Sequence, residues 1–174
     1  MQIFIPYNDY RLSAISLDDK RLNKQIIELG QILSTAIWLE NCGIAEALYA
    51  EGKIHLPTHE NHPIIRNCKY YYYEALDYLY ILLKEYEYRF LKRHSSYLKA
   101  KNFITCYSIF FRYQYEHKPF GNHTTNHKHI TNIYEAYRLC LAEKWKNDKV
   151  IPKWTNRLVP KFYNRPVLKF YKGE

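Results

Sequence analysis

The stretch SLDDKRLNKQIIELGQILSTAIWL, residues 16–39, decides the fold of this chain. Ser16 is followed three positions later by Asp19, which is typical of a helix start with a capping side chain and negative charge in the first turn. We therefore expect an amphipathic helix that begins after Ser16 and continues to about Leu39. Its buried face is predicted by apolar residues that recur every three or four positions, namely Leu22, Ile26, Leu29, Leu33, Ala36 and Ile37.

The opposite face of this helix brings polar groups together. Arg21, Lys24, Gln25 and Glu28 fall within two turns on one side, which places two cations, an amide and a carboxylate close to each other. One interpretation is a catalytic carboxylate among cations. The alternative is an ordinary surface ion pair between Lys24 and Glu28, worth only ~0.3 kcal/mol, and spacing alone favours this alternative.

Further stretches show helical spacing. His62 followed by Pro63 is typical of a cap and a first helical position, and the apolar rhythm after it predicts the longest helix, ending at the basic residues 92–94. The same reasoning predicts a short helix near residues 44–49, a third main helix over 98–111 capped by Ser95 or Ser96, a loop over 114–129, and a fourth main helix over 130–145.

Composition agrees with a helical protein. The chain has 174 residues, enough for one buried core, and 47% of them are hydrophobic, which excludes intrinsic disorder. Only 5 glycines stand against 19 tyrosines, which favours long elements over a turn-rich β protein. We expect an all-α fold: a compact single domain over residues 1–174, with about four main helices in a core over 1–143 and an irregular tail over 144–174.

The location of the protein is also constrained. No apolar run approaches the length of a membrane span, and the start, MQIFIPYNDY, lacks the basic and apolar regions of a signal peptide. Cys42, Cys68, Cys106 and Cys140 are singly spaced, which is typical of reduced thiols. We expect a cytoplasmic protein, of a bacterial cell or of a virus-infected host, without membrane contact.

The net charge points to a polyanionic partner. The formal charge is +9, and residues 144–174 hold nine basic residues and only two acidic ones. Aromatic residues alternate with these cations, as on a surface that binds phosphates and stacks on bases. The alternative is a tail that wraps its aromatic rings over the helices and leaves its lysines in solvent.

Two groups of histidines are candidate sites. His55, His59 and His62 have a spacing that could ligate zinc in a helix, but Pro57 interrupts the turn, so no metal and no cofactor are expected. A second group lies in the loop before the fourth helix, where imidazoles contact phosphate or face water: His123, His127 and His129.

The sequence resembles a known enzyme family in three places. LDDKRL at residues 17–22, followed by Glu28-Leu29, resembles the first helix of the phage-type endonuclease V pyrimidine-dimer DNA glycosylases, with Arg21 where that family has a histidine. His62 and the aromatic helix after it, and the basic aromatic ending over residues 165–173, resemble later parts of the family in the same order. The opening MQIF-x-PY is also similar to short bacterial and phage proteins labelled in the same way.

The resemblance implies a monomeric DNA repair enzyme that removes a damaged or modified base from double-stranded DNA. The N-terminal amine of Met1 would attack the sugar C1′ and cleave the strand at the resulting abasic site, and Glu28 would stabilise cationic character and move protons. The residues expected to contact DNA are Arg21, Lys24, Gln25, His62, Arg66, Lys153, Lys161, Arg165, Lys169 and Tyr171.

Three departures from the family pattern leave alternatives open. Gln2 is bulky, so Met1 is expected to be retained, and the interval between the N-terminus and Glu28 is longer than in the family. Arg21 in place of histidine leaves open a base other than a pyrimidine dimer. The rival hypothesis is a non-catalytic DNA- or RNA-binding protein that uses its basic tail.

Overall fold

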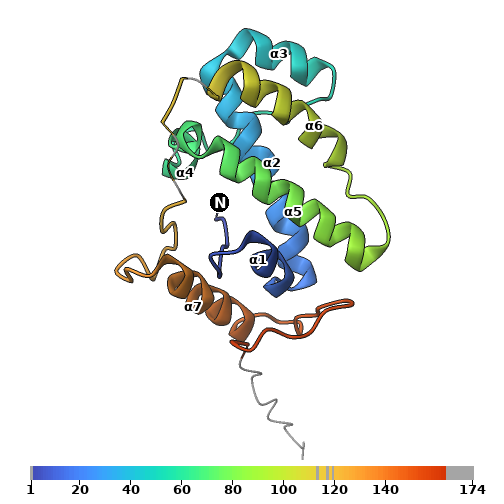
Figure 1. The fold of residues 1–174 in the computed structure, drawn as a ribbon, viewed down its shortest axis with the longest axis vertical. Helices are drawn as coiled ribbons and strands as arrows, with labels where there is room; N and C mark the ends of the chain where they lie inside the picture. The colour runs from blue at the N-terminus through green and yellow to red at the C-terminus, as the bar shows by residue number, and fades with distance from the viewer. Residues whose placement is uncertain (1, 113, 117, 119, 164–174) are drawn as a thin grey trace, which may run out of the picture.

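Helix α2 (Asp19–Glu40) lies at the centre of the computed structural model shown in Figure 1. The described residues are 2–112, 114–116, 118 and 120–163. Helix α2 packs against α5 (Tyr72–Phe90), and α3 (Cys42–Ala50) turns back against its far end. The predicted apolar face of α2 is fully buried at Leu22, Ile26, Leu29, Leu33 and Ile37. The all-α fold is confirmed, because every regular element of the described residues is helical.

A short helix, α1 (Tyr10–Ser16), precedes α2 where the sequence predicted an extended start. Asp9 caps it, because its carboxylate accepts hydrogen bonds from two backbone nitrogens of the first turn at 2.6 and 2.9 Å. The prediction that Ser16 caps the following helix is therefore wrong: Ser16 ends α1, and its hydroxyl donates to the carbonyl of Ser13 at 2.7 Å. Asp18 occupies the N-cap position of α2 without a side-chain capping bond.

The long helix predicted after His62 is interrupted in the structure. His62 does cap a helix, since its Nδ1 accepts from the nitrogen of Ile64 at 3.2 Å, but that helix, α4, covers only Pro63–Arg66. A 3-10 turn separates α4 from α5. The hydroxyl of Tyr71 donates to the carbonyl of Ile64, the group that a continuing helix would offer to the nitrogen four residues later. A side chain thus replaces the helical hydrogen bond.

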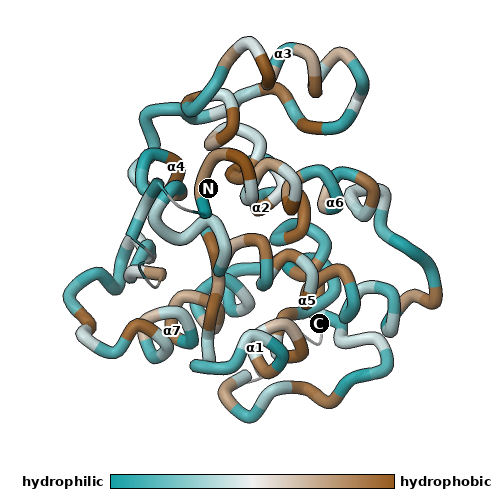
Figure 2. The backbone as a smooth tube through the Cα atoms, turned by 45° about the horizontal axis from the view of Figure 1, so that its top comes forward, coloured by the Kyte–Doolittle hydropathy of each residue, from teal (hydrophilic) through white to brown (hydrophobic). Residues whose placement is uncertain are grey.

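The remaining helices agree with the sequence to within a few residues. The third main helix is α6 (Tyr97–Cys106), which continues into a π-helical turn at Tyr107–Phe111, and the fourth is α7 (Ile133–Lys146), capped by Asn132. In Figure 2 the hydrophobic stretches gather on inner helices such as α2 and α5, whereas the outer connections are largely hydrophilic. None of the helices in the described residues is long and apolar enough to span a membrane.

The chain after α7 returns over the start of α2. Nε1 of Trp154 donates to the carbonyl of Ser16 at 2.9 Å, and the nitrogen of Asp19 donates to the carbonyl of Lys153 at 2.8 Å. Trp154 packs edge-on against Trp145, and both rings are buried. The described part of the tail therefore packs aromatic side chains on the helices, as expected from the alternative to a nucleic-acid-binding tail. Three predicted tail residues lie outside the described part: Arg165, Lys169 and Tyr171.

Arg89 joins α5 to the end of α1. Its side chain is fully buried, and its Nε donates to Glu85 at 2.7 Å. Its terminal nitrogens donate to Asp19 at 3.0 Å and to backbone carbonyls at 2.8–3.2 Å; these carbonyls belong to Ala14, Ile15 and Leu17. An α-helix leaves its last carbonyls without helical partners, so the guanidinium satisfies the C-terminal end of α1.

Replacement of Arg89 by methionine is expected to lower the free energy of unfolding by about 3–5 kcal/mol, because the carbonyls of Ile15 and Leu17 lose their donor and the buried Glu85 keeps only one of its two arginine partners. Urea denaturation followed by circular dichroism measures this change. The control is Arg93→Met, since Arg93 is exposed just after the end of α5 and its loss should change stability by less than about 0.5 kcal/mol. Equal losses in the two variants would contradict the role of Arg89.

Candidate functional site

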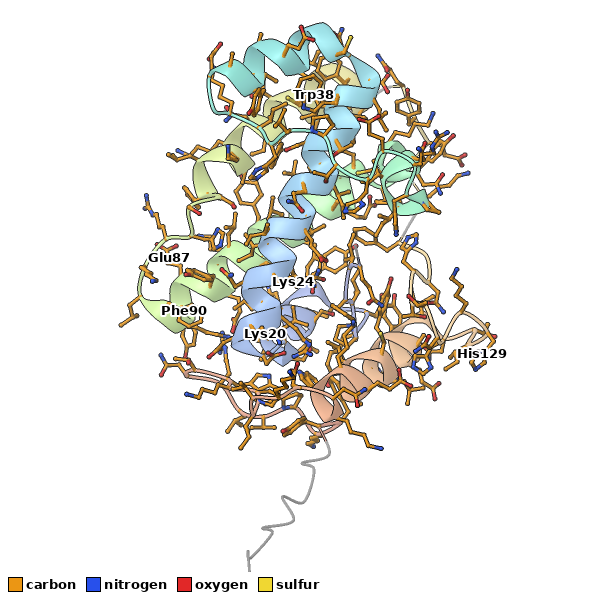
Figure 3. The ribbon with its side chains drawn as sticks, turned by 180° about the vertical axis from the view of Figure 1, so that it is seen from behind. Lys20, Lys24, Trp38, Glu87, Phe90 and His129 are labelled. Carbon is orange, nitrogen blue, oxygen red and sulfur yellow. The ribbon has the colours of Figure 1, made fainter. Side chains whose placement is uncertain are left out.

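A cavity of about 650 Å³ opens between α2, α7 and the N-terminal segment, which we define as residues 2–5. Figure 3 shows Lys20 and Lys24 on the part of α2 nearer to α7. The four polar residues predicted to act together on α2 all line this cavity: Arg21, Lys24, Gln25 and Glu28. The rest of the wall consists of Lys20, Gln2, Phe4, Thr125, Asn126, Cys140, Glu143, Lys144, Asn147 and Asp148.

The N-terminal segment lies along α2 in an extended form. The nitrogen of Phe4 donates to Oε1 of Gln25 at 2.5 Å, and the Nε2 of Gln25 donates to the carbonyl of Gln2 at 2.7 Å. The hydroxyl of Tyr78, on α5, donates to the carbonyl of Phe4 at 2.6 Å. Because Ile3 and Ile5 are buried in the core, these bonds fix a segment that is also held by its apolar side chains.

Glu28 lies at the inner end of this segment. Its side chain is only 14% exposed. Oε2 accepts from the nitrogen of Gln2 at 3.2 Å and from Nε2 of Gln25 at 3.4 Å, whereas Oε1 lies 3.5 Å from Nζ of Lys24. The ion pair between Lys24 and Glu28 that spacing favours is therefore present, but its carboxylate belongs to an enclosed site and contacts the start of the chain.

Arg21 forms the part of the wall between α2 and α7. Its Nη1 lies 2.6 Å from Asp148 and 3.1 Å from Asp18, and only 8% of its side chain is exposed. Burial disfavours the charged guanidinium, but hydrogen bonds to Asp148 and Asp18 outweigh this effect and raise the pKa of Arg21. Nε1 of Trp145 also donates to Asp18, at 2.7 Å. Arg21 is thus a charged group compensated by two carboxylates within the protein.

The histidines near the cavity fall into different environments. Burial lowers the pKa of His62, and the positive charges of the chain's N-terminus and of His59 add to that effect while Glu28 opposes it. Burial and the charge of His62 lower the pKa of His123. His127 lies 3.1 Å from Glu143 of α7, and His129 is exposed. In the described part of the chain, no three His, Cys, Asp or Glu side chains group as a metal site.

Several residues predicted to contact DNA lie away from the cavity wall. Arg66 is exposed and donates to Asn61 at 2.6 Å, and the side chains of Lys153 and Lys161 are exposed on the tail. Met1, like the three tail residues named above, is outside the described residues. The structure therefore brings together the predicted residues of α2 and leaves the other predicted cations elsewhere on the surface.

Helix α7 and the two residues after it supply wall residues that the sequence did not predict. Asp148 reaches Arg21 across 127 positions of the sequence, which spacing along one helix cannot reveal. Cys140 lies 3.2 Å from Nε2 of Gln2. The sequence does carry a signal for this wall, because Cys140, Glu143 and Lys144 of α7 and its C-cap Asn147 recur at helical spacing.

Comparison with known proteins gives one finding. The family model for pyrimidine dimer DNA glycosylase matches residues 1–99, which include the N-terminal segment and all of α2. Neither the search of curated proteins nor the search of solved structures found a match. The matched region stops before α7, so the wall formed by α7 lies outside it.

Asp148→Asn is expected to lower the free energy of unfolding by about 1–3 kcal/mol at pH 7, because Arg21 loses a charge-assisted hydrogen bond. Burial alone would raise the pKa of Asp148, but hydrogen bonds from Arg21 and Lys20 outweigh it and hold this pKa below its ordinary value of 3.8. The ionised carboxylate therefore stabilises the folded state above that pH, and the stabilisation is lost as the pH falls through the lowered pKa.

Urea denaturation of wild type and variant, repeated at falling pH, measures this dependence. The difference between the two proteins should shrink below pH 3.8. Lys20→Met serves as the control, because Lys20 is 71% exposed and an exposed ion pair contributes less than about 1 kcal/mol. A stability difference that is the same at every pH would refute the role of the Asp148 charge.

Proposed function

The chain belongs to the pyrimidine dimer DNA glycosylase family, and from that premise we propose that it excises a damaged or modified base from double-stranded DNA and cleaves the resulting abasic site. The proposed nucleophile is the N-terminal amine of Met1, and the proposed catalytic carboxylate is Glu28. The site needs no metal or cofactor for this chemistry, since an amine and a carboxylate supply it.

The observation that carries the proposal is the hydrogen bond from the nitrogen of Gln2 to Glu28 at 3.2 Å. Although Met1 lies outside the described residues, its amine nitrogen is joined to the nitrogen of Gln2 through two carbon atoms. Standard bond lengths limit the separation of those two nitrogens to about 4 Å. An amine within this distance of the nitrogen of Gln2 can reach the cavity in which Glu28 lies.

The chemistry requires a neutral amine. The ordinary pKa of an α-amino group is about 8, so a useful fraction is unprotonated near neutral pH. Its lone pair forms a bond to C1′ while the bond from C1′ to the base breaks, and the electrons of that bond leave with the base, which takes up a proton. Loss of a proton from nitrogen and opening of the sugar ring give a Schiff base. Its positive charge acidifies C2′, so that loss of a proton from C2′ expels the 3′-phosphate by β-elimination and cleaves the strand.

Glu28 suits both of its proposed roles. A carboxylate beside C1′ stabilises positive charge that develops there and accepts the protons that the amine and C2′ release. Its Oε2 already holds two N–H donors, and its Oε1 faces Lys24, whose side chain is 67% exposed. We assign DNA phosphates to Lys24, Lys20 and Lys144 at the rim of the cavity, with the compensated Arg21 as part of the wall.

The rival hypothesis of a binding protein without catalysis depends on the tail. It requires the tail's aromatic rings to stack on bases. Trp145 and Trp154 are buried, and Phe162 and Tyr163 pack against Trp145. These four rings are therefore engaged within the protein, which favours the cavity over the described tail as the place where DNA is recognised.

Reduction with borohydride in the presence of DNA tests the proposed nucleophile. Wild-type protein mixed with abasic or ultraviolet-irradiated duplex is expected to form a covalent adduct, because borohydride reduces a Schiff base to a stable amine. Acetylation of the N-terminus should abolish the adduct. If the adduct survives acetylation, a lysine such as Lys20 is the nucleophile, and if DNA binds without any adduct, the protein does not form a Schiff base.

Glu28→Gln tests the carboxylate. The variant should retain DNA affinity within about 2-fold and lose a factor of about 10²–10⁴ in the rate of base excision and strand cleavage, the usual contribution of a positioned acid or base. Glu46→Gln is the matched control, because Glu46 is an exposed glutamate on α3. An unchanged rate in the Glu28 variant would remove this residue from the mechanism.

A further inference from the structure

Gln25 is a buried polar side chain in the wall of the cavity. It is 1% exposed, one turn before Glu28 on α2. Its amide oxygen accepts from the nitrogen of Phe4, and its amide nitrogen donates to the carbonyl of Gln2 and to Glu28. Both ends of the amide are therefore used inside the protein, which leaves little of the group available for the DNA contact expected from the sequence.

The two backbone groups that Gln25 binds, the carbonyl of Gln2 and the nitrogen of Phe4, lie two residues apart. The carbonyl of one residue and the nitrogen of the residue two positions later lie on the same edge of an extended chain, and in a sheet a neighbouring strand would bond both. The described residues contain no strand. The side-chain amide of Gln25 therefore takes the place of a neighbouring strand for the segment that contains Gln2 and Phe4.

This pairing fixes the register of the segment. A shift by one residue along an extended chain turns each side chain and each edge group to the opposite face. Such a shift would remove both bonds to Gln25 and would also move Ile3, Phe4 and Ile5, all three buried, from their places in the core.

The same amide also orients the carboxylate. Nε2 of Gln25 and the nitrogen of Gln2 both point to Oε2 of Glu28, at 3.4 and 3.2 Å. With Oε2 held in this way, Oε1 faces Lys24. One side chain thus contacts the segment that leads to the amine and the carboxylate that is proposed to work with it.

We propose that Gln25 is a positioning residue, which sets the register of the N-terminal segment and thereby presents the amine of Met1 to Glu28. The inference rests on the proposed function for its catalytic consequence, but its structural part stands on the bonds of Gln25 alone. A misplacement of reacting groups by about 1 Å can lower a rate about 100-fold, so a side chain that acts on position has a measurable effect on rate.

Hydrogen exchange measured by NMR tests the register without any activity. In the wild type the amide of Phe4 should exchange slowly, since Gln25 is its acceptor. Gln25→Met removes donor and acceptor while keeping an unbranched side chain, and should speed exchange at Phe4 at least about 10-fold while amides of α5 keep their protection. Gln31→Met is the matched control, because Gln31 lies on α2 outside the cavity wall. Unchanged exchange at Phe4 in the Gln25 variant overturns the proposal.

Borohydride trapping tests the consequence for chemistry. With abasic duplex at saturating concentration, Gln25→Met should form the adduct about 10- to 100-fold more slowly than wild type and bind the duplex within about 2-fold of wild type. Gln25→Glu keeps an acceptor for Phe4 but loses the donor to Gln2 and places a second carboxylate beside Oε2 of Glu28, so its trapping rate should fall at least as far.

The outcomes are distinguishable. Parallel losses of DNA affinity, of α5 protection and of trapping rate in both Gln25 variants would mean that Gln25 is merely structural. An unchanged trapping rate would mean that the register of the N-terminal segment does not govern the chemistry. Either result overturns the positioning role. A wild-type protein that forms no adduct would refute the proposed function and with it the catalytic consequence. In that case, hydrogen exchange at the amide of Phe4 would still decide whether Gln25 fixes the N-terminal segment.

Discussion

The carboxylate of Asp18 is buried between two donors, and the shape of the site depends on that arrangement. A buried carboxylate is strongly unfavourable unless hydrogen-bond donors surround it. Nε1 of Trp145 and Nη1 of Arg21 supply these bonds at 2.7 and 3.1 Å. Because Trp145 belongs to the end of α7, the requirement of Asp18 brings that end against the start of α2. The cavity is the space left between the two helices above this junction, and Asp148, next to the end of α7, completes its wall through Arg21.

Charge in the cavity is mixed, which suits the proposed exchange of ion-pair partners when DNA binds. Lys20 and Lys24 are paired with Asp148 and Glu28, but both lysines are more than 60% exposed. Exposed pairs contribute little to stability, so a phosphate can replace either carboxylate at small cost. Arg21 differs, because its two carboxylate partners are almost fully enclosed with it. The rim therefore carries exposed cations in weak ion pairs, while the wall holds Arg21 between two carboxylates.

The sequence predicted the helices best where their periodicity is long and regular, and the departures occur where tertiary contacts replace local bonds. The apolar positions that the spacing predicted on α2, from Leu22 to Ile37, are buried. The helix after His62 ends early because the hydroxyl of Tyr71 takes the carbonyl of Ile64. No apolar stripe predicted α1, so the sequence showed neither its cap at Asp9 nor its end at Ser16. Local patterns cannot show such competition between a side chain and the helix for the same backbone group.

The sequence by itself determined the all-α class, the buried face of α2 and the gathering of Arg21, Lys24, Gln25 and Glu28 on its other face, because all of these follow from the 3.6-residue period of one helix. Only the tertiary structure decided what that polar face meets. The contact of Glu28 with Gln2, the engagement of Gln25 by the N-terminal segment and the closure of the wall by Asp148 join residues 21 to 127 positions apart. The physical reason is that burial and hydrogen bonding act between neighbours in space, and distance along the chain does not encode which neighbours will meet.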